Sequence, residues 1–121
     1  MNRVTGIAPA GFAEDWVAAW NARDLDRILS HYAAGVVFVS PVAASLTGCG
    51  TVIGKAALEA YWRAALDRAP DLHFSLDRVL EGAGALTLLY RNHRGQHVAE
   101  TCEFDAAGRV VRSVACYASG A

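Results

Sequence analysis

The sequence predicts an α+β fold, in which helices from the first half of the chain pack on a strongly curved antiparallel sheet from the second half. Over 121 residues the hydrophobic content is 54% and the charged content 19%, which favours one folded core over disorder. Apolar residues recur at helical spacing up to residue 66 and at a spacing of two from residue 72. We therefore expect a single domain over residues 1–121.

The first helix is predicted to begin near Pro9, a residue that suits the first turn of a helix. The apolar residues that follow share one helical face: Phe12, Trp16, Ala19 and Trp20. A second helix is expected after Asp24, a good N-cap, with Gly35 as its stop. Its apolar face consists of Leu25, Ile28, Leu29 and Tyr32. This interpretation places His31 on the outer side of the second helix.

Residues 36–40, VVFVS, alternate like a strand that stops at Pro41. Val36, Phe38 and Ser40 share one face, so Ser40 stands at the strand's end beside an aromatic. Residues 41–54 hold three glycines and are expected to wind around a rim, with a short strand at 51–53. A third helix follows, ended by Pro70. Its apolar face consists of Leu58, Tyr61, Trp62, Ala65 and Leu66.

Four strands are predicted in the second half, separated by glycine-containing turns at 82–84, 94–95 and 106–108. They cover residues 72–77, 86–93, 97–105 and 109–117. Because each turn joins neighbours in sequence, these strands should form an antiparallel meander. A curved sheet with amphipathic helices against one face leaves a conical cavity between them.

Glu100 is the candidate acid or base. On the strand 97–105 it shares a mostly apolar face with Val98, Cys102 and Phe104, so it should point into the core. A buried carboxylate must find partners or take a proton, and desolvation raises its pKa, which suits acid–base chemistry. A glutamate paired with Arg91 or with a buried indole, in a purely structural role, is an equally good hypothesis.

Two strand registers decide the neighbours of Glu100, and the sequence leaves both open. Across one turn, either Ser113, Ala115 and Tyr117 face inward, or Val114 and Cys116 do. Across the other turn, either Arg91 with Leu89 or Tyr90 with Asn92 lies beside Glu100. Val110, Val114, Ala99 and Thr101 are assigned to the outer face of the sheet.

Four segments carry a resemblance to a known family: NARDLDRILSHYA, VVFVSP, GKAALEAYW and EFDAAGRVVRSVACY. Together they resemble the NTF2-like superfamily, in its SnoaL-like and ketosteroid-isomerase-like branch, over roughly residues 12–117. The resemblance implies the cone-shaped NTF2-like, or cystatin-like, fold with a hydrophobic pocket. It also implies a homodimer through the outer sheet face. It says little about activity, because this fold carries many functions.

The resemblance also implies places for site residues. Ser40 stands where ketosteroid isomerases have their aspartate base, and Trp16 stands at the place of their oxyanion tyrosine. Glu100 stands at the place of their oxyanion acid, an aspartic acid that an apolar site keeps neutral. Trp62 falls where a supporting tyrosine is usual. A serine hydroxyl needs a partner to abstract a carbon-bound proton, so a standard isomerase mechanism is not expected.

The remaining candidate pocket residues are mostly aromatic. We expect Trp16 to donate its indole N–H to Glu100. His93 and His97 flank a turn and are expected in solvent. The full candidate set for a ligand is Trp16, Trp20, Tyr32, Phe38, Ser40, Trp62, Cys102, Ser113 and Tyr117, with Tyr90 and Arg91 as possible helpers of Glu100.

Composition narrows the classes of function. A formal net charge of −1 with scattered charges predicts no nucleic-acid or membrane surface. No signal peptide is evident in residues 1–12. Cys49, Cys102 and Cys116 show no zinc spacing, and reduced thiols in the cytoplasm are expected, with no metal and no cofactor.

The predicted function is binding of a small, mostly apolar or carbonyl-containing molecule. Isomerase, cyclase or hydrolase chemistry by Glu100 is one hypothesis. A non-catalytic binding protein and a dimerising interaction module are the alternatives.

Overall fold

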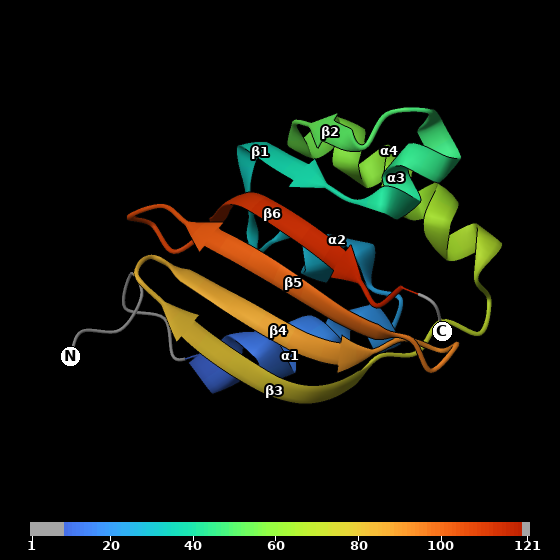
Figure 1. Ribbon diagram of the computed structural model, residues 1–121. Coiled ribbons are helices and arrows are strands. Elements are labelled where there is room, and N and C mark those ends of the chain that lie inside the picture. The colour runs from blue at the N-terminus through green and yellow to red at the C-terminus, as the bar shows by residue number, and fades with distance from the viewer. Residues whose placement is uncertain (1–8, 120–121) are drawn as a thin grey trace.

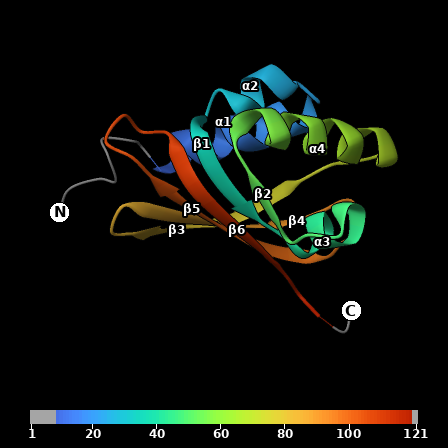
Figure 2. The same ribbon diagram turned by 90° about the horizontal axis from the view of Figure 1, so that it is seen from above.

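The computed structural model describes residues 9–119, which form four helices and a curved six-stranded sheet (Figure 1). Figure 2 shows α1, α2 and α4 on the same side of that sheet. The first eight residues, where the sequence predicted no signal peptide, lie outside this range. No helix within 9–119 is long and apolar enough to cross a membrane.

The first two helices form the expected elbow. α1 spans Pro9–Asn21 and buries Phe12, Trp16 and Trp20, while α2 spans only Leu25–Leu29. Asp24 caps α2, because its side chain accepts a hydrogen bond from the backbone N–H of Arg27.

The prediction that α2 continues to Gly35 was wrong, since strand β1 (Tyr32–Val39) already begins at Tyr32. Tyr32 pairs with Val110 of β6, and the backbone N–H of Val110 donates to the carbonyl of His31 at 2.8 Å. Although Ile28, Leu29 and Tyr32 have helical spacing, Tyr32 is in a strand because it pairs with β6. His31 consequently lies between α2 and β1 and contacts Asp15 of α1, with Nε2 2.7 Å from Oδ2.

The rim segment contains a helix that the sequence analysis missed. α3 spans Pro41–Thr47 and is followed by the short strand β2 (Thr51–Ile53), which was predicted. Ser40 is the N-cap of α3, Pro41 opens it, and Gly48 ends it in a left-handed conformation (φ 83°). This sequence pattern is typical of a short helix.

The third predicted helix is α4 (Lys55–Arg68), and the four long strands follow it. They are β3 (Ser75–Gly82), β4 (Ala85–Arg91), β5 (His97–Phe104) and β6 (Val110–Tyr117). The spatial order is β2-β1-β6-β5-β4-β3, so the predicted antiparallel meander holds for β3 to β6. The sheet is otherwise antiparallel, and only the pairing of β1 with β6 is parallel among the described strands.

Alternation along the strands sorts side chains between the two faces of the sheet. The inner face of β4 and β5 buries Leu86, Leu88, Tyr90, Val98 and Cys102 against the helices. Val110, which the sequence analysis assigned to the outer face, is also buried, because a register shift between Glu103 and Phe104 turns it inward. All three cysteines are free thiols, and only Cys102 is buried.

Candidate functional site

A cavity of about 900 Å³ lies between the inner face of the sheet and the helices, a size typical of small-molecule pockets. Aromatic side chains from α1, β1, α4 and the strands form much of its wall. Six of them were candidates from the sequence: Trp16, Trp20, Phe38, Trp62, Tyr90 and Tyr117. The wall also includes Glu100, so an ionisable carboxyl group borders an aromatic cavity.

Glu100 points inward from the middle of β5, as the alternation predicted, and is only 3% exposed. Both of its carboxyl oxygens have hydrogen-bond partners. The hydroxyl of Tyr90 donates to Oε1 at 3.1 Å, and the hydroxyl of Ser113 donates to Oε2 at 3.0 Å. Tyr90 comes from β4 and Ser113 from β6, so the two neighbouring strands hold the carboxyl group from both sides.

Burial raises the pKa of Glu100 from its ordinary value of 4.5 to about 7. The hydrogen bonds from Ser113 and Tyr90 act in the opposite direction, because they stabilise the charged form, but desolvation is the larger effect. The neutral and the ionised forms of Glu100 are therefore both populated near neutral pH. No cation pairs with this carboxylate within residues 9–119.

The register of β4 and β5 is the one that brings Tyr90 inward. Leu88 lies directly opposite Glu100, and Tyr90 lies opposite Val98 on the same inner face. Arg91 lies opposite His97, is exposed, and does not line the cavity. The strand pairing therefore places Tyr90, and not Arg91, on the same face as Glu100.

The register of β5 and β6 brings Ser113, Ala115 and Tyr117 inward, one of the two sets that the sequence left open. In this pairing Ala115 lies opposite Glu100 and Ser113 lies opposite Cys102. Ser113 nevertheless reaches Glu100, because diagonal neighbours on one sheet face lie within side-chain reach.

The expected hydrogen bond between Trp16 and Glu100 is absent. Trp16 instead donates its indole N–H to the hydroxyl of Tyr32 at 2.9 Å. Tyr32 is fully buried behind the cavity wall, where desolvation raises the pKa of its hydroxyl well above the ordinary value. The Trp16 ring stacks on Phe74, another residue of the cavity wall, with ring centroids 5.7 Å apart.

Ser40 has a local structural partner. Its hydroxyl accepts a hydrogen bond from the backbone N–H of Val42 at 3.1 Å, which caps α3. Tyr61 and Tyr117 approach the same hydroxyl. Burial raises the pKa of Tyr61 to about 12, while the contact with Ser40 acts to lower it. No histidine contacts Ser40 in the described part of the chain.

Four of the candidate ligand-binding residues lie behind the cavity wall rather than in it: Tyr32, Ser40, Cys102 and Ser113. Ser113 donates a hydrogen bond to Glu100, and Ser40 contacts Tyr61 and Tyr117. Glu100 and these two tyrosines do line the cavity. A direct contact of any of the four with a ligand stays a prediction.

Two aromatic wall residues were missed as site candidates, namely Tyr61 of α4 and Phe74, which precedes β3. Tyr61 lies on the apolar face of a predicted helix, and Phe74 alternates with polar residues, so both looked like ordinary core positions. The charge of Glu100 adds to burial in raising the pKa values of all four tyrosines, Tyr32, Tyr61, Tyr90 and Tyr117.

His93 also lines the cavity, contrary to the expectation that it lies in solvent. Its side chain is 18% exposed, and its Nε2 atom lies 3.9 Å from Oδ1 of Asp71. Its Nδ1 atom is buried without a partner among the described residues. No group of three metal-binding side chains occurs within residues 9–119.

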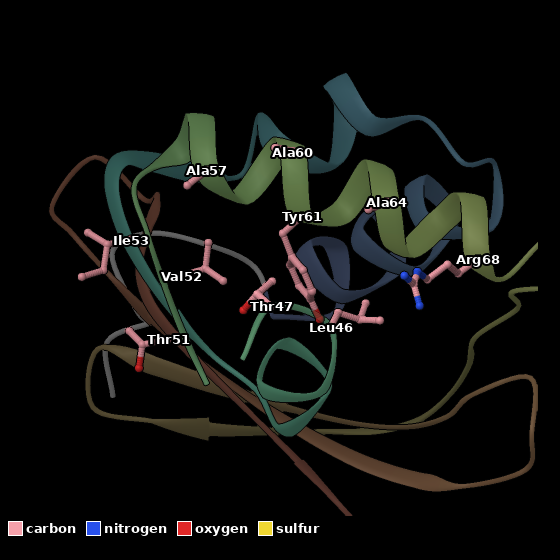
Figure 3. A pocket seen from close by; sticks show the side chains of 10 residues that line it. All are labelled: Leu46, Thr47, Thr51, Val52, Ile53, Ala57, Ala60, Tyr61, Ala64 and Arg68. Carbon is pink, nitrogen blue, oxygen red and sulfur yellow. The ribbon is translucent and has the colours of Figure 1, made fainter. Parts of the chain in front are cut away.

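A second, more open groove of about 500 Å³ lies between α4, α3 and β2 (Figure 3). It shares Leu46, Tyr61 and Arg68 with the wall of the main cavity. These three side chains therefore separate the two spaces. The groove contains no acidic side chain, so the acid–base group is confined to the main cavity.

Comparison with known proteins agrees with this geometry. Residues 13–117 match the sequence profile of the SnoaL-like domain. No curated protein matches the chain significantly in sequence. The crystal structure of a SnoaL-like protein of unknown function from Burkholderia thailandensis is similar to 98% of this chain and 100% of its own, with 39% identity and a TM-score of 0.92.

Two more distant structures show the same fold. An NTF2-like protein of unknown function from Burkholderia pseudomallei has 19% identity and a TM-score of 0.72, over 93% of this chain and 92% of its own. TerC, co-crystallised with polyporic acid, has 16% identity and a TM-score of 0.76, over 93% of each chain.

Proposed function

The chain belongs to the SnoaL-like family of the NTF2-like superfamily, and on that premise we propose that it binds a small, mostly apolar molecule with a carbonyl or enol oxygen in the main cavity. We further propose that Glu100 exchanges a proton with this molecule. The observation that carries the proposal is a carboxyl group 3% exposed, bordering an aromatic cavity, with a pKa raised to about 7.

The shape and the chemistry of the cavity support a small ligand. Its volume of about 900 Å³ suits a molecule of a few rings, and the aromatic residues of its wall give it a largely apolar lining. The co-crystallisation of TerC with polyporic acid is in keeping with such a ligand for this fold.

A carboxyl group with a pKa near 7 serves both directions of proton transfer at neutral pH. In its ionised form Glu100 accepts a proton from a carbon next to the ligand's carbonyl, which leaves an enolate. In its neutral form it returns a proton to carbon or to the enolate oxygen, which restores the carboxylate. Tyr90 and Ser113 fix the orientation of the carboxyl group throughout.

Proton exchange at carbon tests this proposal directly. With 2-tetralone in deuterated buffer near pH 7, we expect the protein to accelerate the loss of α-proton NMR signal. The Glu100→Gln variant should bind 2-tetralone but lose that acceleration. The matched control is Glu103→Gln, because Glu103 stands on the outer face of the same strand and pairs with Arg112. If Glu100→Gln keeps the full exchange rate, the proton-transfer role is excluded.

A non-catalytic binding protein is the second candidate, favoured by Ser40. This residue stands where the related isomerases carry their base, yet its hydroxyl caps α3. Binding of 2-tetralone without any accelerated exchange by the unaltered protein would support this second candidate over the first.

We also propose a cytoplasmic homodimer that forms through the outer face of the sheet. Ala99, Thr101 and Val114 present half-buried, small or β-branched side chains there, and the free thiols suit a reducing compartment. Sedimentation equilibrium should show a dimer that Thr101→Arg dissociates. A monomer in the unaltered protein would exclude this assembly.

A further inference from the structure

The ionisable side chains that line the main cavity lie at two different depths. Glu100 is the ionisable group at the buried end, whereas Arg68, Asp71 and Arg94 are exposed and His93 is half-buried. The last turn of α4 and the turn between β4 and β5 lie at the same end of the molecule in both views (Figures 1 and 2). The mouth of the cavity is therefore edged by charges, while its interior is aromatic.

Arg68 occupies a fixed place on this mouth. It stands in the last turn of α4, where a cation is favoured by the helix dipole. The guanidinium group of Arg23 donates to the carbonyls of Leu66 and Ala69 and so pins the end of this helix. Figure 3 shows the Arg68 side chain on the same side of α4 as Tyr61 and Leu46. Its guanidinium group makes no ion pair within residues 9–119.

Arg94 stands in a turn that side-chain hydrogen bonds hold together. Oδ1 of Asn92 accepts hydrogen bonds from the backbone N–H groups of Arg94 and Gln96, both at 3.0 Å. The Asn92 amide donates to the side chain of Gln96, so both polar side chains are used by the turn itself. The guanidinium group of Arg94 has no ion-pair partner in the described part of the chain.

Asp71 is the one exposed acid on the cavity wall, and it does not neutralise either arginine. Its carboxylate lies 3.9 Å from His93 Nε2 and forms no ion pair with Arg68 or Arg94. Elsewhere Arg27, Arg63 and Arg112 each pair with an acid. Two unpaired guanidinium groups thus line the same cavity as the buried carboxyl group of Glu100.

We propose that the ligand is an apolar acid, which places an anionic group at the mouth beside Arg68 and Arg94 while its apolar body enters the aromatic interior. This inference rests on the proposed function and names the substrate class of the same cavity. Guanidinium groups bind carboxylate, sulfonate and phosphate oxygens in the same way, by paired N–H donors. The anionic end also orients the ligand, so that its uncharged end reaches Glu100.

Two fluorescent probes with one skeleton test the proposal. 8-Anilinonaphthalene-1-sulfonate carries an anionic group, and N-phenyl-1-naphthylamine is the same body without it. We expect Arg68→Ala and Arg94→Ala each to weaken binding of the sulfonate about threefold, and the double variant about tenfold, as for partly exposed charge contacts. Affinity for the neutral probe should change less than about twofold. Raising the salt concentration should weaken binding of the sulfonate alone.

Matched controls locate the effect. Arg78→Ala and Arg91→Ala remove exposed arginines that lie off the cavity wall, and they should leave both affinities unchanged. Ser45→Trp, which adds bulk at an exposed wall position of α3, should weaken both probes. Equal sulfonate affinity in the double variant and the unaltered protein would overturn the proposal of an anionic ligand, even if the neutral probe binds. If neither probe binds the unaltered protein, the proposed function itself fails.

Discussion

Two glutamates on one strand, Glu100 and Glu103, lie three positions apart and on opposite faces of the sheet. Glu100 faces inward, 3% exposed, and accepts hydrogen bonds from two hydroxyl groups. Glu103 faces outward, with about half of its side chain exposed, and lies 3.5 Å from Arg112. The same residue type is therefore a solvated ion on one face and a candidate proton carrier on the other. The comparison shows that strand alternation, more than residue type, sets the chemistry of each carboxyl group.

The largest expected difference between the two faces is in packing. Leu88 lies opposite Glu100 on the inner face and is fully buried, while Leu89 is half-buried on the outer face. Leu88→Ala should lower the free energy of unfolding by about 3 kcal/mol, because it leaves a cavity in the core. Leu89→Ala should lower it by about 1 kcal/mol, in proportion to the smaller buried area. Urea unfolding measures both, and equal losses would contradict the assignment of the faces.

The next largest effect is on the pH dependence of stability. Between pH 4.5 and about 7, Glu100 keeps its proton in the folded state and loses it in the unfolded state, so stability falls as the pH rises through this window. The full penalty, about 3 kcal/mol, is reached above pH 7. Glu100→Gln should therefore be more stable than the unaltered protein at pH 8, by about that amount, and similar to it at pH 4.

The matched control for this pH dependence is Glu103→Gln on the outer face. Its free energy of unfolding should differ from that of the unaltered protein by less than about 0.5 kcal/mol at either pH, as for an exposed ion pair. Chemical denaturation at the two pH values measures the effect. A destabilised Glu100→Gln variant at pH 8 would mean that the ionised carboxylate is favourable in its site.

The hydrogen bonds to Glu100 should produce a smaller effect. Ser113 and Tyr90 both lower its pKa, so Ser113→Ala and Tyr90→Phe should each raise that pKa above about 7, by roughly one unit or less. On the outer face the hydroxyl groups of Thr87 and Thr101 contact each other at 2.8 Å. Thr87→Val, the outer-face control, should leave the pKa of Glu100 unchanged. Carboxyl NMR titration of the three variants distinguishes these outcomes.

The smallest expected effects concern the two helix caps. Ser40 caps α3 at a buried position, and Asp24 caps α2 at an exposed one. Ser40→Ala should cost about 1 kcal/mol of stability and Asp24→Ala about half of that, because water replaces the exposed cap more readily. Thermal unfolding measures both. A larger loss in Asp24→Ala would contradict a role for Ser40 as the buried cap.

Much of this arrangement could be predicted from local patterns. Alternation on β5 placed Glu100 inward, because the period of a strand is fixed at two. The spacing on α1 and α4 likewise identified Trp16, Trp20 and Trp62 as inward-facing aromatics. Features that depend on pairing between distant strands could not be derived in this way. Tyr32 was expected in a helix but pairs with β6. Whether Arg91 or Tyr90 faces inward depends on the β4–β5 register, which is set by a turn that Asn92 stabilises.

Side-chain partners across the core were also beyond the sequence. Trp16 and Glu100 were expected to meet, but the hydroxyl of Tyr32 lies nearer to the indole and accepts its hydrogen bond. α3 is a different case, because the sequence Ser40-Pro41 followed by Gly48 contains the signals of a short helix. The three glycines of residues 41–54 nevertheless favoured the interpretation of this segment as an irregular rim.

The measurement that tests the central claim most directly is the pKa of Glu100 in the free protein, from side-chain carboxyl NMR shifts across pH. We expect a value near 7. A value close to the roughly 4.3 of an exposed glutamate would contradict it. In that case the inner carboxyl group is solvated, and the proposed proton transfer in the cavity fails.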